Sequence, residues 1–323
     1  MASDLLEVRN LHTHFYTHRG VARAVDGVDL AVEEGATLGV VGESGCGKSV
    51  TALSIMRLVP EPPGRIVRGE ILFKGRDILG MREDEMRNVR GNQVAMVFQE
   101  PMTSLNPVFT VGFQIREALS LHRGMKGKEA TDYAEHMLSL VGISDPGRRL
   151  TEFPHQLSGG MRQRVMIAMA LSCGPSLLIA DEPTTALDVT IQAQILDIFR
   201  RLKETTSMAL LLITHDLGIV YETAERVVVM YAGQVVEEGS RDEVFGDPLH
   251  PYTIGLLRSH PTGSAARGRL HVIRGAVPDA LRMPNGCRFH PRCPRAEEVC
   301  RTESPALDGA GGSGRRKVRC WNP

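Results

Sequence analysis

GESGCGKS, residues 42–49, is the stretch of sequence that decides the fold. It matches the pattern G-x-x-x-x-G-K-[ST] in full and lies between an apolar run, ATLGVVG (36–42), and the helix-like SVTALSIMRL (49–58). A strand, a glycine-rich turn and a helix in this order are typical of a phosphate-binding loop. The sequence therefore predicts a site for the phosphate groups of a nucleotide at this turn.

The chemistry of this loop follows from the types of residue in it. Glycines let the backbone curl so that its N–H groups point at phosphate oxygens, and the start of the following helix adds the positive end of its dipole. Lys48 is expected to reach the β- and γ-phosphates of ATP, and Ser49 is expected to hold Mg²⁺. The predicted ATP-binding residues of the loop are Gly42, Glu43, Ser44, Gly45, Cys46, Gly47, Lys48, Ser49 and Val50.

A second element of a nucleotide site is SLLIADEP, residues 176–183. Its apolar strand delivers Asp181 at the carboxyl end, where ligands bind in α/β sheets. Asp181 suits a Mg²⁺ partner, directly or through water, and Glu182 could polarise an attacking water. Apolar strands often end in acidic residues, so this motif indicates a nucleotide site only because the phosphate loop is also present.

The bulk composition is that of an ordinary globular protein. The chain has 323 residues, of which 42% are hydrophobic, and its 38 basic side chains balance 38 acidic ones. This charge balance argues against a general nucleic-acid binder. No apolar run reaches the roughly 18 residues that span a bilayer, and the start shows no secretory signal, so we expect a protein of the cytoplasm.

Short apolar runs recur before residue 240, and helical patterns separate several of them, which predicts parallel strands in an α/β sheet. The runs cover residues 5–10, 36–42, 94–98, 176–181, 208–214 and 227–232. The segments 113–122, 129–142 and 161–172 are helical in pattern and have no convincing strand between them. We therefore expect a helical insertion at about residues 105–172.

The composition of the sequence changes after about residue 240, where prolines become frequent and apolar runs are no longer found. Such a segment must depend on something other than a large core. We therefore expect a nucleotide-binding domain over residues 1–245 and a smaller extension over residues 246–323.

A third motif, LSGGMRQR (157–164), lies between the two nucleotide motifs and makes the chain resemble the ATP-binding cassette (ABC) family. The resemblance implies a P-loop NTPase of the ABC type, with a RecA-like mixed sheet core and a helical signature subdomain. It also implies a head-to-tail dimer, in which Ser158, Gly159 and Gly160 of one chain contact the ATP held by the other. The family usually has glutamine where this chain has Met161.

Further positions match the family's motifs. VFQEP places Gln99 at the Q-loop, LITHD places His215 at the switch histidine, and TALD (185–188) places Asp188 at the D-loop of the dimer interface. The resemblance implies catalytic roles for Glu182, His215 and Gln99 and a Mg²⁺ site on Ser49, Gln99 and Asp181. NLHTHFY places Phe15 where the family stacks an aromatic ring on adenine, with Tyr16 as the alternative.

Within the family, the chain looks like the ATPase subunits of dipeptide and oligopeptide importers. FQEPMTSLNPVFTVGFQI (98–115) and DPLHPYTIGLLRSHP (247–261) carry this likeness, and methionine at position 161 is usual in that subfamily. Only 109 residues separate Lys48 from Ser158, too few for the long coiled coil of the DNA-repair type. Nickel and glutathione importers share these segments, so the substrate stays open.

The resemblance to importers implies partners and a location. We expect a second ATPase subunit that is a paralogous chain, two transmembrane permease subunits and an extracytoplasmic substrate-binding protein. The chain would then lie at the cytoplasmic face of the inner membrane. A rival hypothesis is a soluble ABC ATPase that responds to a metal or redox signal through its tail.

Four of the six cysteines are in the tail: Cys287, Cys293, Cys300 and Cys320. Their spacing, C-x5-C-x6-C-x19-C, matches neither the usual zinc knuckle nor the common ferredoxin patterns, so spacing leaves the metal undecided. From residue 287 to 320, basic residues outnumber acidic ones by eight to four, which would offset a thiolate site. Some peptide-importer ATPase subunits carry a [4Fe–4S] cluster on such cysteines, so the resemblance favours that cluster, with zinc second and free thiols third.

A cluster of histidines near the start, His12, His14 and His18, invites a metal interpretation. Alternation along a strand would place His12 and His14 on one face. With no acidic or cysteine partner close by in the sequence, ordinary surface residues are the favoured interpretation.

Overall fold

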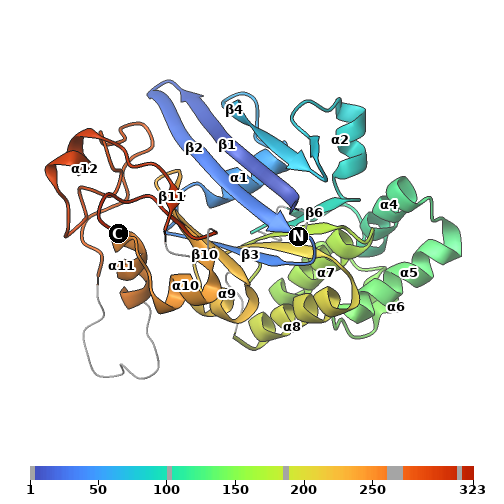
Figure 1. The fold of residues 1–323 in the computed structure, drawn as a ribbon. Coiled ribbons are helices and arrows are strands. Elements are labelled where there is room, and N and C mark those ends of the chain that lie inside the picture. Colours follow the sequence, from blue (N-terminus) through green and yellow to red (C-terminus); the bar gives the residue numbers. More distant parts are fainter. Residues whose placement is uncertain (1–3, 100–103, 185–188, 260–271, 311–314) are drawn as a thin grey trace. The chain divides into compact units, whose positions relative to one another are not determined.

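The computed structural model describes residues 4–99, 104–184, 189–259, 272–310 and 315–323, drawn in colour in Figure 1. Contacts divide the chain into two compact units. The first unit contains Glu33–Ala36 and Gly80–Leu211, and the second contains Asp4–Val32, Thr37–Leu79 and Leu212–Pro323. Each unit is described separately below.

The second unit begins with a four-stranded sheet of order β2-β1-β4-β5. Its strands are β1 (Asp4–Thr17), β2 (Gly20–Glu33), β4 (Gly64–Phe73) and β5 (Arg76–Asp77). Strand β1 runs antiparallel to β4, and β4 antiparallel to β5. The strand expected at residues 5–10 is confirmed and is longer than predicted. Strands β2 and β4 were not predicted, because their many polar residues leave no continuous apolar run.

The second unit also contains the strand that leads into the phosphate loop. Strand β3 (Thr37–Val41) is buried throughout and pairs in parallel with β9 (Arg226–Tyr231). Strand β9 pairs antiparallel with β10 (Gln234–Ser240), which pairs with β12 (Lys317–Val318), and β12 pairs with β11 (Asp308–Gly309). The last residues of the chain therefore add two short strands beside β10.

The helices of the second unit are short. They are α1 (Lys48–Ile55), α9 (Leu217–Thr223), α10 (Arg241–Gly246), α11 (Pro251–Ser259) and α12 (Glu298–Thr302). Helix α1 begins directly after the phosphate loop, as the motif predicts. A small cluster of buried side chains joins α11 and the extension to β9, through Tyr231, Tyr252 and Phe289. The prediction that the extension lacks a large core of its own agrees with this cluster.

The first unit contains two of the predicted parallel strands and most of the helices. Strands β6 (Val94–Val97) and β7 (Leu177–Asp181) are parallel neighbours, and every residue in them is buried. The helices are α2 (Glu83–Val89), α4 (Val111–Arg123), α5 (Gly127–Leu140), α6 (Pro146–Arg149), the 3₁₀ turn η1 (Pro154–Gln156), α7 (Gly159–Leu171) and α8 (Val189–Thr205). Strand β8 (Ala209–Ile213) contains the boundary between the units.

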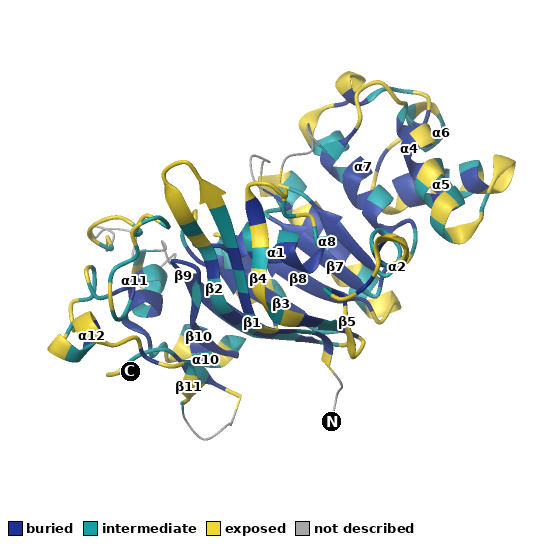
Figure 2. Cartoon of the chain, turned by 90° about the horizontal axis from the view of Figure 1, so that it is seen from above, coloured by how far each residue is buried: buried dark blue, intermediate teal, exposed yellow. Residues whose placement is uncertain are grey.

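The three helices expected in the insertion are confirmed as α4, α5 and α7, and the described residues between 104 and 172 form no strand. Figure 2 shows that α4 and α5 each have a buried side and an exposed side. That division follows from apolar residues at helical spacing. Among the described residues, no helix is both long and apolar enough to cross a membrane.

Candidate functional site

The phosphate loop has a backbone that only glycine accommodates at two positions. Gly42 has φ +154° and Gly47 has φ +104°. A Cβ atom on Gly42 would overlap the carbonyl oxygen of Met230, and one on Gly47 would lie 2.5 Å from that of Ala24. The loop therefore packs against the backbone of β9 and β2, and its glycines are required by space as well as by conformation.

Lys48 lies inside the curl of the phosphate loop. Its ammonium group donates to the carbonyl oxygens of Gly42, at 2.8 Å, and Glu43, at 3.1 Å, and the side chain is buried. Beside it, burial raises the pKa of the Cys46 thiol, which keeps this cysteine neutral and unreactive. The loop thus presents a positive charge held in place by its own backbone, as phosphate binding requires.

Strand alternation distinguishes the two aromatic candidates on β1. Thr13 is buried, and its hydroxyl bonds that of Ser54 on α1 at 2.8 Å. Phe15 comes two residues later and therefore shares the face of Thr13, on the side of the helix that follows the phosphate loop. Tyr16 points to the opposite face and is 51% exposed. This placement favours Phe15 as the adenine-facing ring.

In the first unit, the structure brings together two residues predicted to act in catalysis. The side-chain amide of Gln99 donates to the carboxylate of Glu182 at 3.1 Å. Glu182 follows the end of β7 and has φ +47°, a left-handed conformation that is uncommon outside glycine and recurs at functional sites. Asp181, the last residue of β7, is buried. The carboxyl end of β7 therefore presents two carboxylates and an amide.

The signature motif forms the start of α7. Ser158 is the N-cap, and its hydroxyl accepts from the backbone N–H of Met161 at 3.3 Å. Ser158 and Gly159 are exposed and Gly160 is half-buried, so this helix start is open to a ligand. Deeper in the helix, the amide of Gln163 donates to the carbonyl of Pro183 at 2.7 Å, which ties α7 to the segment after Glu182.

His215 is an exposed residue just past the end of β8. The backbone N–H of Thr214 donates to the carbonyl of Val40 at 3.2 Å, so His215 lies beside the strand that leads into the phosphate loop. Asp216 then caps α9 by accepting from two backbone N–H groups. The histidine is therefore held between a strand end and a capped helix.

The roles predicted for the site residues all stay predictions, and for two of them the structure adds little. Asp188 lies outside the described residues. Of the expected Mg²⁺ ligands, Ser49 belongs to the second unit, whereas Gln99 and Asp181 belong to the first.

Comparisons with known proteins agree with these motifs. A family model described as ABC transporter matches residues 25–185, and one described as Oligopeptide/dipeptide transporter, C-terminal region, matches residues 236–300. The Oligopeptide transport ATP-binding protein AppD of Bacillus subtilis is 53% identical over 99% of this chain and 97% of its own length. The chain belongs to the ABC transporter ATPases of the oligopeptide/dipeptide type.

A second relative and a solved structure are also similar to this ABC ATPase. The Dipeptide transport ATP-binding protein DppD of Escherichia coli is 52% identical over 99% of this chain and 97% of its own length. The ATP-binding cassette MJ0796, solved as a dimer in a post-hydrolysis state with ADP and Pi, matches with a TM-score of 0.66 and 28% identity. That match covers 73% of this chain and 98% of MJ0796. The fold class predicted from the sequence, a P-loop NTPase of the ABC type, is confirmed.

The C-terminal extension of this ABC ATPase brings its four cysteines to one cavity. Its lining includes the four thiols and the side chains of His250, Phe289 and Trp321. The backbone N–H of Cys287 donates to the carbonyl of Cys300 at 2.8 Å, which fixes these two cysteines side by side. Burial raises the pKa of the thiols of Cys287, Cys293 and Cys320, which favours their neutral form, and a bound metal cation would favour the thiolates.

The spacing of these thiols bears on which metal would fit. Across the described part of the chain, one group of at least three His, Cys, Asp or Glu residues has its ligand atoms within 4.8 Å of one another, and it contains no cysteine. Tetrahedral zinc, with Zn–S bonds of about 2.3 Å, would hold sulfurs about 3.8 Å apart. A cubane cluster, with one thiolate on each of four irons, takes a wider set of thiols.

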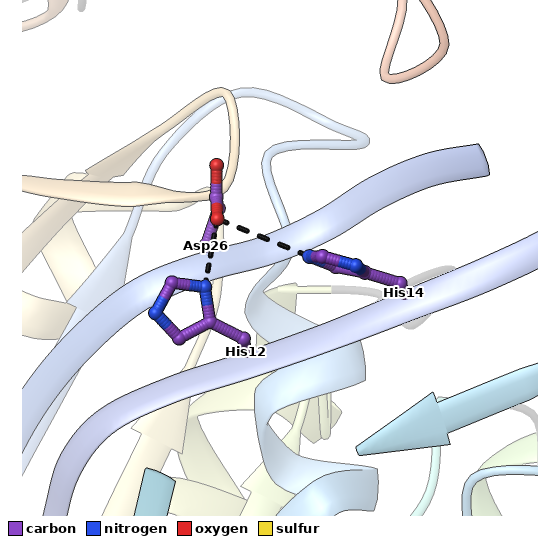
Figure 3. A group of neighbouring side chains, drawn as sticks. All are labelled: His12, His14 and Asp26. Atoms are coloured by element: carbon purple, nitrogen blue, oxygen red, sulfur yellow. Dashed lines mark hydrogen bonds and ion pairs between the residues drawn. The ribbon is translucent and has the colours of Figure 1, made fainter. Parts of the chain in front are cut away.

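The group that does meet this distance is His12, His14 and Asp26 (Figure 3). A carboxylate oxygen of Asp26 lies 2.8 Å from Nδ1 of His12 and 3.9 Å from Nε2 of His14. Its other oxygen is bound by Arg288. Burial alone would raise the pKa of Asp26, but Arg288 and His12 outweigh it and the pKa is lowered. Because arginine already neutralises the carboxylate, the trio is best described as a polar network between β1, β2 and the extension.

Three side chains make contacts that were not predicted from the sequence: Asp26, Tyr252 and Arg292. Asp26 is an acidic partner for the histidines, but it comes from β2, a strand that was not predicted. The side chains of Tyr252 and Arg292 both contact Glu43 of the phosphate loop. The His-Pro-Tyr segment was noticed as a family mark, yet nothing in the spacing of the sequence shows that its tyrosine bonds a loop 209 residues away.

Proposed function

We propose that this chain binds and hydrolyses ATP to power the import of dipeptides or oligopeptides through a membrane ABC transporter. Support comes from relatives named as oligopeptide and dipeptide transport ATP-binding proteins over nearly the whole chain. The match of residues 236–300 to the oligopeptide/dipeptide C-terminal region adds to it. Nickel or glutathione importers of the same subfamily are the alternative. The proposed domains remain 1–245 for the cassette and 246–323 for the extension.

The proposed chemistry places Glu182 against the water that attacks the γ-phosphate. Its hydrogen bond to Gln99 is the observation that carries this role, because the amide orients the carboxylate at the end of β7. His215 would contact the γ-phosphate, and Lys48 would contact the β- and γ-phosphates.

Oxygen donors of the expected magnesium site fit a hard cation. Ser49, Gln99 and Asp181 offer a hydroxyl, an amide and a carboxylate oxygen, the donor types that Mg²⁺ prefers. When bound, the ion neutralises charge on the phosphates. Holding that charge in place is the proposed task of these three side chains.

The proposed assembly is a dimer in which Ser158, Gly159 and Gly160 contact the ATP bound by the other subunit, with Asp188 at the interface. The open start of α7 and the dimer formed by the related cassette MJ0796 support it. We further propose a paralogous ATPase as partner, two permease subunits and a substrate-binding protein. The chain would work at the cytoplasmic face of the inner membrane.

For the extension, we propose a [4Fe–4S] cluster held by Cys287, Cys293, Cys300 and Cys320. The shared cavity supports a metal site, and the resemblance to peptide-importer ATPase subunits favours iron–sulfur over zinc, which is the second choice, and over free thiols, the third. Closing four ligands around a metal would contribute folding free energy to a segment with little core. An anaerobic preparation should be brown and contain about four iron atoms per chain; stoichiometric zinc without iron would favour the second choice.

Replacing Glu182 with glutamine tests the ATPase proposal. Glu182→Gln keeps the shape of the side chain and removes its charge, so ATP should still bind while the hydrolysis rate falls by about 100-fold or more. ATP binding and phosphate release would be measured on the complex with its partners. Glu204→Gln, an exposed residue of the first unit, is the matched control. Normal turnover in Glu182→Gln would contradict the assignment.

A further inference from the structure

The C-terminal extension contacts the phosphate loop at Glu43. The guanidinium of Arg292 forms two hydrogen bonds to the Glu43 carboxylate, at 2.6 and 3.0 Å. The hydroxyl of Tyr252 accepts from the Glu43 backbone N–H at 2.9 Å. All three residues belong to the second unit. Both the side chain and the main chain of one loop residue are therefore held by residues far along the chain.

Arg292 is itself fixed on several sides. Its side chain is only 4% exposed and lies over the rings of Tyr231 and Phe289. Its guanidinium also donates to the carbonyl oxygens of Arg274, at 3.1 Å, and Ile273, at 3.3 Å. A two-bond arginine–carboxylate pair in such surroundings has a defined geometry, unlike an exposed ion pair.

Tyr252 is anchored as firmly. Its ring is fully buried at the start of α11, against Tyr231 and Phe289. Burial raises the pKa of its hydroxyl, so the phenol stays neutral while its oxygen accepts from the Glu43 N–H. Just before the helix, the N–H groups of Leu249 and His250 both donate to the buried carboxylate of Glu237, at 2.9 Å each. The tyrosine is therefore attached to β10 as well as to the loop.

These contacts act on a loop that must accept a triphosphate. A carboxylate beside that site repels the incoming anion unless its charge is neutralised. Arg292 neutralises Glu43 and holds its carboxylate, while Lys48 already bonds the Glu43 carbonyl. With the N–H bonded to Tyr252, every polar group of Glu43 has a fixed partner.

We propose that Arg292 and Tyr252 are positioning residues for ATP binding, so that the folded extension sets the affinity of the phosphate loop for nucleotide. The proposal rests on the ATP-binding role given above but adds a task for the extension. Any change that loosens the extension, including loss of a metal from the neighbouring Cys293, would then weaken ATP binding without touching a residue that contacts the phosphates.

A double-mutant cycle on the full chain tests this. Fluorescent ATP binding would be titrated for Arg292→Met, Glu43→Gln, the double variant and a control, Arg282→Met, an exposed arginine of the extension. Arg292→Met should raise the Kd about tenfold, the range of a charged hydrogen bond. Adding Glu43→Gln should recover most of that loss, because the unpaired carboxylate is gone. The Km for ATP should rise far more than kcat falls.

Each result has a defined reading. If Arg292→Met binds ATP as tightly as Arg282→Met, the positioning role is wrong while the ATPase assignment stands. If the unmodified chain binds no ATP, the proposed function itself fails. Should Arg292→Met not fold, Tyr252→Phe removes only one hydroxyl, and hydrogen exchange should then be faster at the Glu43 amide. Unchanged exchange there would also overturn the proposal.

Discussion

The cassette strands and the C-terminal extension of this ATPase reach order by different physical means. Strands β3, β7 and β8 are buried at every position and consist almost wholly of apolar residues. In the described part of the extension beyond residue 272, the buried residues are few and include two arginines, Arg288 and Arg316. Hydrophobic burial therefore accounts for the strands, whereas the extension combines charged hydrogen bonds with apolar side chains that pack on the cluster around Tyr231.

This difference has a consequence for how each region fails. A buried apolar strand loses stability gradually as methyl groups are removed. A segment with few buried apolar residues, held in part by ion pairs and by the proposed metal site, depends more on individual atoms. We therefore expect that a single substitution of a polar residue lowers stability more in the extension than in the cassette strands.

The largest expected effect is on the cysteine site. Cys300→Ser removes one of four proposed ligands, so metal content should fall by more than half and the extension should lose about 3 kcal/mol or more of stability. Metal analysis and limited trypsin digestion would measure both, since the extension is rich in arginine. Cys173→Ser, which lies outside the cavity, is the control. Equal metal content in the two variants would contradict the proposed role of Cys300 as a ligand.

The second largest effect is expected for Lys48→Ala, which should change ATP binding but not the stability of the cassette. Loss of the ammonium should weaken ATP binding by about 100-fold, or about 2.7 kcal/mol. Because the loop conformation depends on glycines and neighbouring backbone, the melting temperature without nucleotide should change little. Nucleotide titration and thermal unfolding would test this, with Lys203→Ala as control. A large drop in melting temperature would mean that the lysine also holds the fold.

The difference between the apolar strands and the extension also explains which features the sequence could predict. Apolar runs and the glycine pattern predicted β3, β7, β8 and the phosphate loop, because burial and φ constraints are local signals. Residues 161–172 were correctly predicted as helical for the same reason.

The remaining features depend on contacts between distant segments. The link from Arg292 to Glu43 spans 249 residues, and that from Asp26 to Arg288 spans 262. The periodicity of the sequence does not predict contacts between residues so far apart. The sequence therefore predicted Glu43 as a loop residue but not its contacts with Arg292 and Tyr252. Strand β2 was not predicted because its polar and apolar residues alternate and form no continuous apolar run.

A third, smaller effect is expected at Glu237, where the two regions meet within the second unit. Its fully buried carboxylate accepts from two backbone N–H groups before α11 and lies 3.4 Å from Arg316. Glu237→Gln replaces one acceptor oxygen by a donor, which faces an N–H group and leaves it unsatisfied. We expect a loss of about 2 kcal/mol, measured by denaturant unfolding against Glu222→Gln. A loss below about 0.5 kcal/mol would show that this anchor is dispensable.

The smallest effect is expected from an exposed ion pair in the extension, which differs in its burial from the pair of Arg292 and Glu43. Arg301 lies 3.9 Å from Glu298 on α12, but the two side chains are 62% and 87% exposed. Water screens such a pair, so Arg301→Ala should change stability by less than about 0.5 kcal/mol. Denaturant unfolding and ATP titration beside Arg292→Met would measure the contrast between two arginines of one extension. If Arg301→Ala weakened ATP binding as much as Arg292→Met, loss of any positive charge in the extension would suffice, and the geometry around Glu43 would not be what sets the affinity.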